Sequence, residues 1–327
     1  MPSVLELPTA ADVADAARAI SGVALRTPLI TSPELDAITG ARVFLKPETL
    51  QRTGSFKFRG AYNRLSRIPD DHKSAGVVAM SSGNHALGVA TAAKLLGIRA
   101  TNLMPIDSPA TKRERTAAAG AEVVLFDREK DDRVAMAHAI AKERGAVVVP
   151  PYDDFFIMAG QGTVGREIVE DLGKLNLTPD AVFFPCGGGG LLAGSALAIH
   201  EQAPSTDLYS VEPEEFDDHA RSFIAGERLA NHKASGSLCD GLLVSTPGEL
   251  TFSINKRHVA GGLVVSDDEV RRAVAFAFRE LKLVVEPSGT AALAALLGKR
   301  IDVRGQTVVA VLTGGNVDPT LFANLIS

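Results

Sequence analysis

Short apolar runs alternate with longer segments rich in alanine and leucine between residues 76 and 150. The short runs are rich in β-branched residues and end at turn residues, which is typical of buried strands. We expect these strands at Gly76–Ser82, Arg99–Pro105, Glu122–Phe126 and Ala146–Pro150. The longer segments are helical in pattern and stop at glycine, and they are Asn84–Gly97, Pro109–Gly120 and Asp131–Gly145. This alternation predicts βαβ units and a parallel sheet with helices on both faces.

The same alternation returns after residue 180. Further strands are expected at Ala181–Phe184, Leu208–Val211, Gly262–Val265 and Thr307–Leu312. Helices are expected at Leu191–Gln202 and from a capping box at Ser266–Glu269 to Leu281. We therefore predict an α/β protein with two lobes, each a mostly parallel twisted sheet flanked by helices. The break falls near Pro150 and Pro151, and a cleft between two such lobes is the usual place for a ligand.

Composition excludes several classes of function. Hydrophobic residues make up 46% of the 327 residues and charged residues 22%, so the chain can form a packed core. The net charge is −5 and no basic stripe is present, which argues against nucleic acid as a partner. No apolar run approaches the roughly 18 residues of a membrane span, and no signal segment precedes the first helix. The only cysteines, Cys186 and Cys239, stand far apart, so we expect a cytoplasmic protein with reduced thiols.

A run of four glycines follows the strand at Ala181–Phe184. Gly187–Gly190 stand before a helix, where several backbone N–H groups and the helix dipole can converge on a phosphate. A tight turn that needs positive φ is the simpler explanation, although one or two glycines would satisfy it. The loop also matches the dinucleotide-binding pattern through Gly188, Gly190 and Ala193, with Glu212 at the end of the next strand. An NAD-binding oxidoreductase therefore stays open as an alternative.

Two further stretches carry candidate chemistry. Lys57 lies between two phenylalanines, so its amine can sit in a partly apolar pocket, where a lowered pKa makes it nucleophilic. A surface lysine on an amphipathic helix fits the same pattern. Residues 81–85 (SSGNH) follow a predicted strand and begin a helix, so their hydroxyls and free N–H groups suit a carboxylate. An ordinary helix cap is the alternative there.

Together these motifs carry a resemblance to a known family. The matches are SFKFRGA, SSGNH, AGQGT, CGGGGLLAG, EPSG and TGGNVD, in that order along nearly the whole chain. The chain resembles the serine/threonine dehydratase and serine racemase family of pyridoxal-phosphate enzymes, which have the tryptophan-synthase-β type of fold. The resemblance implies a large cofactor-binding domain of residues 1–66 and 150–327 and a small substrate-binding domain of residues 67–149. We expect no C-terminal regulatory domain, because the chain ends just after the last motif.

The resemblance also assigns roles to individual residues. Lys57 would carry pyridoxal phosphate as a Schiff base and remove the α-proton, with Ser82 as the acid/base on the opposite ring face. The other cofactor-binding residues would be Phe56, Asn84, Gly187, Gly188, Gly189, Gly190, Leu191, Gly241 and Thr313. Substrate would contact Ser81, Asn84 and His85 through its α-carboxylate. Arg133 aligns with an arginine that contacts a second substrate carboxylate in some relatives, although a solvated helix-face arginine is as plausible.

A metal site is implied in the same way. Glu212 and Asp218 would ligate Mg²⁺ or Ca²⁺ by carboxylate and Phe216 by its carbonyl, and such oxygen ligands suit a hard cation. The alternative is a solvated acidic helix start, because acidic residues favour helix N-termini.

We therefore expect a pyridoxal-phosphate-dependent dehydratase, or ammonia-lyase. It would convert a β-hydroxy-α-amino acid, of the threonine/serine or 3-hydroxyaspartate type, to a 2-oxo acid and ammonia. An amino-acid racemase with elimination as a side activity shares every motif. Tyr152 and Val244 make the pocket less polar than that of the best-known racemase. The resemblance implies a homodimer.

Overall fold

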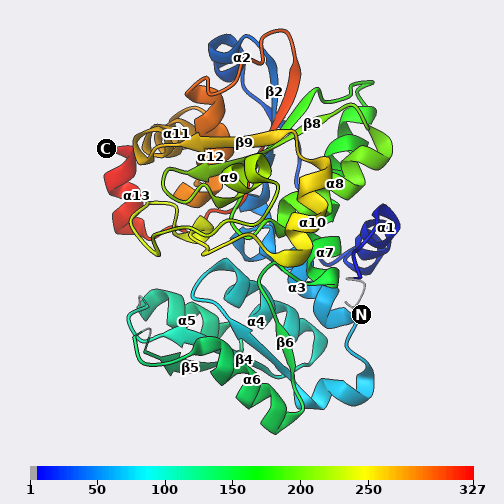
Figure 1. Cartoon of the computed structure of the whole chain (residues 1–327), viewed down its shortest axis with the longest axis vertical. Coiled ribbons are helices and arrows are strands. Elements are labelled where there is room, and N and C mark those ends of the chain that lie inside the picture. The colour runs from blue at the N-terminus through cyan, green and yellow to red at the C-terminus, as the bar shows by residue number, and fades with distance from the viewer. Residues whose placement is uncertain (1–5, 109, 128) are drawn as a thin grey trace.

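The computed structural model describes residues 6–108, 110–127 and 129–327. Two sheets form the framework, one at each end of the long axis (Figure 1). The larger has the strand order β1-β2-β10-β7-β8-β9 and the smaller has the order β5-β4-β3-β6. Every strand pair is parallel except β1 with β2. The predicted fold class is thus confirmed.

In chain order within the described residues, two strands of the large sheet precede the strands of the small sheet and four follow them. The strands of the large sheet are β1 (Ile30–Thr31), β2 (Arg42–Pro47), β7 (Ala181–Pro185), β8 (Asp207–Pro213), β9 (Gly261–Val265) and β10 (Thr307–Leu312). The small sheet is contiguous in sequence and consists of β3 (Val77–Met80), β4 (Ala100–Pro105), β5 (Glu122–Phe126) and β6 (Val147–Val149). The domain boundaries inferred from the resemblance, 1–66 with 150–327 and 67–149, stay a prediction.

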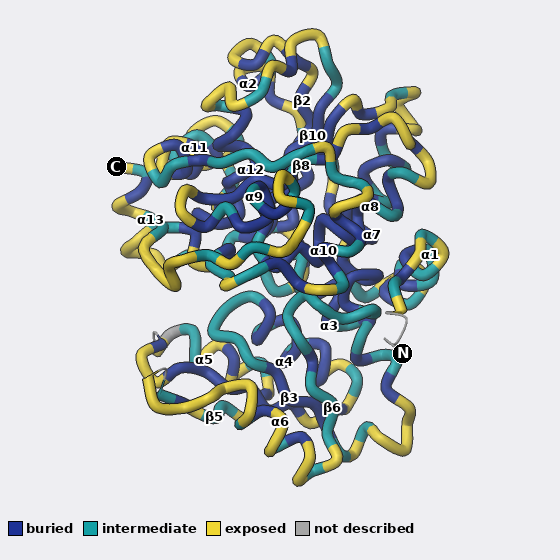
Figure 2. The backbone as a smooth tube through the Cα atoms, in the orientation of Figure 1, coloured by how far each residue is buried: buried dark blue, intermediate teal, exposed yellow. Residues whose placement is uncertain are grey.

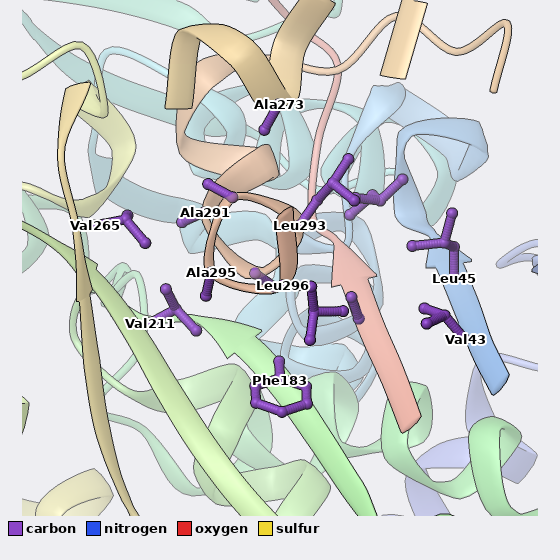
Figure 3. Close-up of a cluster of buried hydrophobic side chains, with 14 of the residues drawn as sticks. Val43, Leu45, Phe183, Val211, Val265, Ala273, Ala291, Leu293, Ala295 and Leu296 are labelled. Carbon is purple, nitrogen blue, oxygen red and sulfur yellow. The ribbon is translucent and has the colours of Figure 1, made fainter. Parts of the chain in front are cut away.

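Helices cover both faces of the large sheet. One face packs against α2 (Pro33–Thr39), α11 (Asp267–Arg279) and α12 (Pro287–Leu297). The other packs against α7 (Phe155–Gly173) and α8 (Gly190–Gln202). Along β2 the side chains alternate between the two faces, with Val43 and Leu45 toward α12 and Phe44 toward α7. Figure 3 shows α12 packed against the strands of the first face, and in Figure 2 the strands β2, β10 and β8 and the helix α12 are mostly buried whereas the outer helices carry exposed stretches.

The small sheet is also covered on both sides. Helices α3 (Lys57–Ser66) and α4 (Asn84–Leu96) pack on the face that holds Val77 and Ala79, and α6 (Arg133–Arg144) packs on the face that holds Val78. Helix α5 (Ala110–Ala118) completes this lobe, and Pro109, where we predicted its start, lies outside the described residues. The remaining helices are α1 (Ala10–Ala19), α9 (Asp218–Ala225), α10 (Glu249–His258) and α13 (Pro319–Ile326). None of the described helices is both long and apolar enough to cross a membrane.

Glycines let α7 and α8 approach each other closely. A Cβ on Gly162 would lie 2.5 Å from the Gly194 carbonyl oxygen, and one on Gly194 would lie 2.0 Å from the Met158 carbonyl oxygen. Real Cβ atoms do not tolerate such distances, so only glycine fits at these positions. The second glycine of the AGQGT motif and the glycine of LLAG are therefore explained by the packing of α7 against α8.

A buried ion cluster joins α3 to the large lobe. The Arg59 guanidinium is fully buried and donates to both oxygens of Glu48, at 2.8 Å each, and to both oxygens of Glu167, at 2.7 and 2.9 Å. Lys46 adds a bond of 2.6 Å to Glu167. Burial disfavours the charged Glu48 carboxylate, but the guanidinium outweighs this effect and lowers the Glu48 pKa. The cluster fixes the start of α3 because Arg59 is two residues from Lys57.

Replacing Arg59 with methionine should destabilise the protein by about 3–5 kcal/mol, because the buried Glu48 carboxylate loses its guanidinium partner. Urea denaturation followed by circular dichroism measures this change. The control is Arg304→Met, which breaks an exposed pair with Asp302 and should leave the curve nearly unchanged. Equal effects of the two substitutions would contradict the role assigned to the cluster.

Candidate active site

A cavity of about 600 Å³ lies between the two sheets. Residues from both lobes line it, at the carboxyl ends of β3 and β7 and at the starts of α3, α4, α6 and α8. It contains every residue expected to act in catalysis or to bind cofactor or substrate: Phe56, Lys57, Ser81, Ser82, Asn84, His85, Arg133, Gly187, Gly188, Gly189, Gly190, Leu191, Gly241 and Thr313. The structure thus brings together residues that are up to 257 positions apart in sequence (Thr313 minus Phe56).

Lys57 is the first residue of α3, and its side chain enters this cavity. Its Nζ donates to the carbonyl oxygen of Pro151 at 2.8 Å and lies 5.1 Å from the centre of the Phe56 ring. Burial lowers the pKa of Lys57 to about 8, although the Glu286 carboxylate acts in the opposite direction. A useful fraction of the amine is therefore neutral near pH 7, as a nucleophile or a base requires.

The glycine loop is shaped to accept an anion. Thr251 Oγ1 donates to the Gly188 carbonyl at 2.6 Å, and Asn255 Nδ2 donates to the Gly189 carbonyl at 3.3 Å. These bonds hold the carbonyls on one side of the loop. Among the described hydrogen bonds, the N–H groups of Gly187–Gly189 have no acceptor. Free N–H groups at the start of α8 suit an anion, and the residues present thus fit the phosphate of pyridoxal phosphate.

Side chains are excluded from the loop by close neighbours. Gly189 has φ +88°, and a Cβ there would lie 2.7 Å from both His219 and Asn255. A Cβ on Gly188 would lie 2.3 Å from the Tyr152 ring. Both the backbone conformation and the space behind the loop therefore require glycine.

The NAD-binding alternative does not fit this geometry. It needs Glu212 to reach a ribose, but Glu212 is fully buried outside the cavity lining. Its two oxygens accept from the backbone N–H groups of His219, at 3.0 Å, and Ala220, at 2.8 Å. The carboxylate is thus already engaged with the start of α9.

Residues 81–85 connect β3 to α4 at the wall of the cavity. His85 is buried, and its Nε2 lies 3.0 Å from the Val149 carbonyl, which can only accept. Burial, together with the charge of Lys57, lowers the pKa of His85 to about 3, so the ring is neutral and its single proton faces Val149. The expected contact of His85 with a substrate carboxylate stays a prediction. Its backbone N–H, at the start of α4, can make this contact while the ring keeps its bond to Val149. Ser81 and Ser82 line the same wall.

Sequence reasoning missed several polar residues that line the cavity. Lys112 pairs with Asp240 at 3.0 Å, and Arg115 donates to Asn316 Oδ1 at 2.9 Å, so α5 is tied to the large lobe at both points. Lys233 pairs with Glu215 at 2.7 Å. In the sequence these basic residues have the spacing of a solvated helix face or loop, which gave no signal of a site.

Arg133 differs from the other basic residues of the lining. It stands at the start of α6 on the exposed rim of the cavity. Lys57, Lys112, Arg115 and Lys233 each have a hydrogen-bond or ion-pair partner, whereas Arg133 has none within the described residues. A guanidinium with five free donors can bind a carboxylate with two parallel hydrogen bonds.

The expected metal ligands lie outside the cavity, where β8 leads into α9. Asp218 Oδ1 accepts from Asn231 at 2.6 Å, whereas its buried Oδ2 has no partner. Burial raises the pKa of Asp218 to about 7, and burial and the Asp218 charge raise that of Glu212 well above its ordinary value. An orphaned carboxylate oxygen beside a second buried carboxylate fits a hard cation. No group of three or more His, Cys, Asp or Glu side chains placed to hold a metal occurs in the described part of the chain.

Known proteins place the chain in a family. Residues 20–314 match the model of the pyridoxal-phosphate dependent enzymes, and the chain belongs to this family. It is 45% identical to an L-threo-3-hydroxyaspartate ammonia-lyase from Pseudomonas sp., over 98% of this chain and 99% of that protein. It is 41% identical to serine racemase from Schizosaccharomyces pombe over the full length of both. The structure of maize serine racemase superposes with a TM-score of 0.91 at 34% identity, covering 98% of this chain and 97% of that one.

Replacing Gly189 with alanine should weaken pyridoxal-phosphate binding by roughly tenfold or more, because the side chain strains the loop and crowds its support. Equilibrium dialysis of the apoprotein measures the affinity. Gly22→Ala is the matched control, since Gly22 also has positive φ, +74°, but has no atom within 4 Å of the new Cβ. Unchanged affinity of the Gly189 variant would contradict phosphate binding by this loop.

Proposed function

We propose that this protein is a pyridoxal-phosphate-dependent ammonia-lyase that converts 3-hydroxyaspartate to a 2-oxo acid and ammonia. The observation that carries the proposal is the Arg133 guanidinium, which has no hydrogen-bond partner among the described residues and stands on the rim of the cavity that holds Lys57. A substrate with a second carboxylate would supply its missing partner. Two relatives that bear the name L-threo-3-hydroxyaspartate ammonia-lyase, 45% and 41% identical, support this substrate class.

The chemistry divides between cofactor and protein. Pyridoxal phosphate, when bound, takes up the electron pair that remains when the substrate loses its α-proton. Lys57 accepts that proton, and its lowered pKa keeps part of the amine neutral for the task. The Pro151 carbonyl accepts a hydrogen bond from Nζ and holds the amine at the wall of the cavity. The β-hydroxyl then takes up a proton and leaves as water, and hydrolysis of the released unsaturated amine gives ammonia and the 2-oxo acid.

The remaining residues orient the two molecules. We expect Gly187–Gly190 and Leu191 to hold the phosphate, Asn84 to contact the ring oxygen, and Thr313 and Gly241 to contact the ring. Thr313 offers a hydroxyl rather than a carboxylate, so it does not keep the pyridine nitrogen charged. A weaker electron sink favours prompt loss of the β-hydroxyl. Ser81 and the N–H groups that begin α4 bind the α-carboxylate.

Racemisation is the second candidate activity. Ser82 lines the same cavity as Lys57, and a hydroxyl there could return the proton to the opposite face of the substrate carbon. The relationship to serine racemase supports this candidate. Elimination needs only Lys57, whereas racemisation needs a proton donor on each face.

A divalent cation, a dimer and the cytoplasm complete the proposal. Mg²⁺ or Ca²⁺ would bind Glu212, Asp218 and the carbonyl of Phe216, beside the orphaned Asp218 oxygen. Both cysteines are free and buried, which fits a reducing compartment. The homodimer rests on the resemblance alone.

Arg133→Ala should raise the KM for 3-hydroxyaspartate by about 10–100-fold, because a charge-assisted bond to the second carboxylate is lost. The kinetics of threonine, which lacks this carboxylate, should change little. Release of 2-oxo acid measures both. The control is Arg113→Ala, since Arg113 lies on α5, bonds the Ile106 carbonyl and does not line the cavity. If Arg133→Ala affects both substrates alike, the acidic-substrate proposal fails.

Ser82→Ala should abolish racemisation and any use of the D-enantiomer, while much of the elimination from the L-substrate persists. Chiral chromatography of the remaining substrate, run in parallel with release of 2-oxo acid, separates the two activities. Lys57→Ala provides the reference for complete loss. A loss of L-elimination as complete in Ser82→Ala would assign Ser82 to carboxylate binding instead.

Added Mg²⁺ or Ca²⁺ should raise the melting temperature and EDTA should lower it, because a ligand bound only by the folded state stabilises that state. Asp218→Asn should remove this response. Asp207→Asn, at the exposed start of β8, is the control and should retain it. A melting temperature that changes with neither the added cation nor EDTA would count against the metal site.

A further inference from the structure

A chain of hydrogen bonds crosses the wall of the cavity between the EPSG, SSGNH and TGGNVD motifs. Asn84 Nδ2 donates to Glu286 Oε1 at 2.6 Å. Asn316 Nδ2 donates to Asn84 Oδ1 at 2.7 Å, and Arg115 donates to Asn316 Oδ1 at 2.9 Å. The chain therefore runs from a carboxylate in the large lobe to a guanidinium on α5 in the small lobe.

The chemistry of its neighbours fixes the direction of every bond. Asn316 Nδ2 also donates to the Thr53 carbonyl at 2.7 Å. A carbonyl can only accept and a guanidinium can only donate, so the Asn316 amide fits in one orientation. Its second N–H must then meet an acceptor, and this places the oxygen of Asn84 toward Asn316. The Asn84 NH₂ group consequently faces Glu286 and the cavity.

Two glycines leave the space that this chain occupies. A Cβ on Gly314 would lie 2.3 Å from Glu286 Oε1 and 3.1 Å from Asn84 Nδ2. A Cβ on Gly54, which has φ +74°, would lie 2.8 Å from Asn316 Oδ1. Side chains at either position would displace the asparagines. The glycines of TGSFK and TGGN are thus explained by the hydrogen-bond chain as well as by the turns.

We propose that Asn316 is a positioning residue that holds the Asn84 amide with its NH₂ toward the cofactor, so that the site selects a negatively charged ring oxygen. Asn84 uses one N–H for Glu286 and retains the other for a group in the cavity, where only an acceptor can meet it. Arg115 and Glu286 hold the two ends of the chain. The inference rests on the pyridoxal-phosphate chemistry of the proposed function and is independent of the substrate.

The electrostatics of Glu286 are consistent with this arrangement. Burial and the nearby Asp240 raise the pKa of Glu286 to about 7, while Asn84, Lys112 and Arg115 act in the opposite direction. Because the oxygen of Asn84 is already held by Asn316, the amide keeps its orientation in either protonation state of Glu286. Asn316, rather than Glu286, is therefore the residue on which the orientation depends.

A double-mutant cycle tests the inference without any substrate. The four proteins are the wild type, Asn84→Ala, Asn316→Ala and the double variant, and the measured quantity is the affinity of the apoprotein for pyridoxal phosphate. Asn84→Ala and Asn316→Ala should each weaken binding, on the order of tenfold. The double variant should bind no more weakly than Asn84→Ala, because Asn316 acts through Asn84. Losses that multiply in the double variant would overturn the proposal.

The absorbance spectrum of the bound cofactor provides a second readout. Both single variants should shift absorbance from the visible to the near-ultraviolet, because a negative ring oxygen loses its donor. Asn316→Asp is nearly isosteric and keeps the contact with Arg115, but it cannot donate to Asn84, so it should show the same shift. Asn63→Ala is the control for lost stability, since Asn63 is buried, bonds the Phe156 carbonyl at 2.7 Å and lies outside the cavity lining. A wild-type spectrum in Asn316→Asp, or the shift in Asn63→Ala, would refute the role of Asn316.

Discussion

The placement of Lys57 depends on the buried guanidinium of Arg59. Two carboxylates, Glu48 and Glu167, hold this cation with four hydrogen bonds, and the three groups come from three separate segments of the chain. A buried charge tolerates little displacement because its partners must remain within bonding distance. The start of α3 is therefore fixed against the large lobe. Lys57 lies two residues before Arg59, so its position is fixed as well, and its Nζ donates to the Pro151 carbonyl.

Several polar groups at the cavity are oriented by hydrogen bonds from neighbouring residues of the protein. Thr251 and Asn255 hold the carbonyls of the glycine loop, and Asn316 holds the amide of Asn84. In each case a supporting side chain binds the oxygen atoms of the group, which leaves its N–H groups free for the cavity. Such support is what preorganises a binding site, since donors that already point inward need no rearrangement when a ligand binds. Arg133 differs, because its side chain has no hydrogen-bond or ion-pair partner within the described residues.

The alternating pattern of apolar runs was sufficient to predict the parallel sheets, since most residues of β2, β3, β4, β7, β8 and β10 are buried and the helices α4 and α6 end at left-handed glycines. The residues that the resemblance assigned to catalysis and to cofactor and substrate binding line one cavity, although their individual roles stay predictions. Sequence could not reveal the contacts of Asn316, which belongs to the TGGNVD motif, or those of Asp240 and α5, because their partners are distant in sequence. Nor could it show that Glu212 already bonds the start of α9, or that the one proton of the His85 ring faces Val149.

The central claim is that Lys57 carries pyridoxal phosphate, and covalent labelling tests it most directly. The holoprotein is reduced with borohydride, digested and analysed by mass spectrometry, because only a lysine joined to the cofactor through a reducible bond retains it. We expect the label on the peptide that contains Lys57 and its loss in Lys57→Ala. Lys112 and Lys233 also line the cavity and serve as internal controls. Label on either of these lysines, with Lys57 unmodified, would contradict the account.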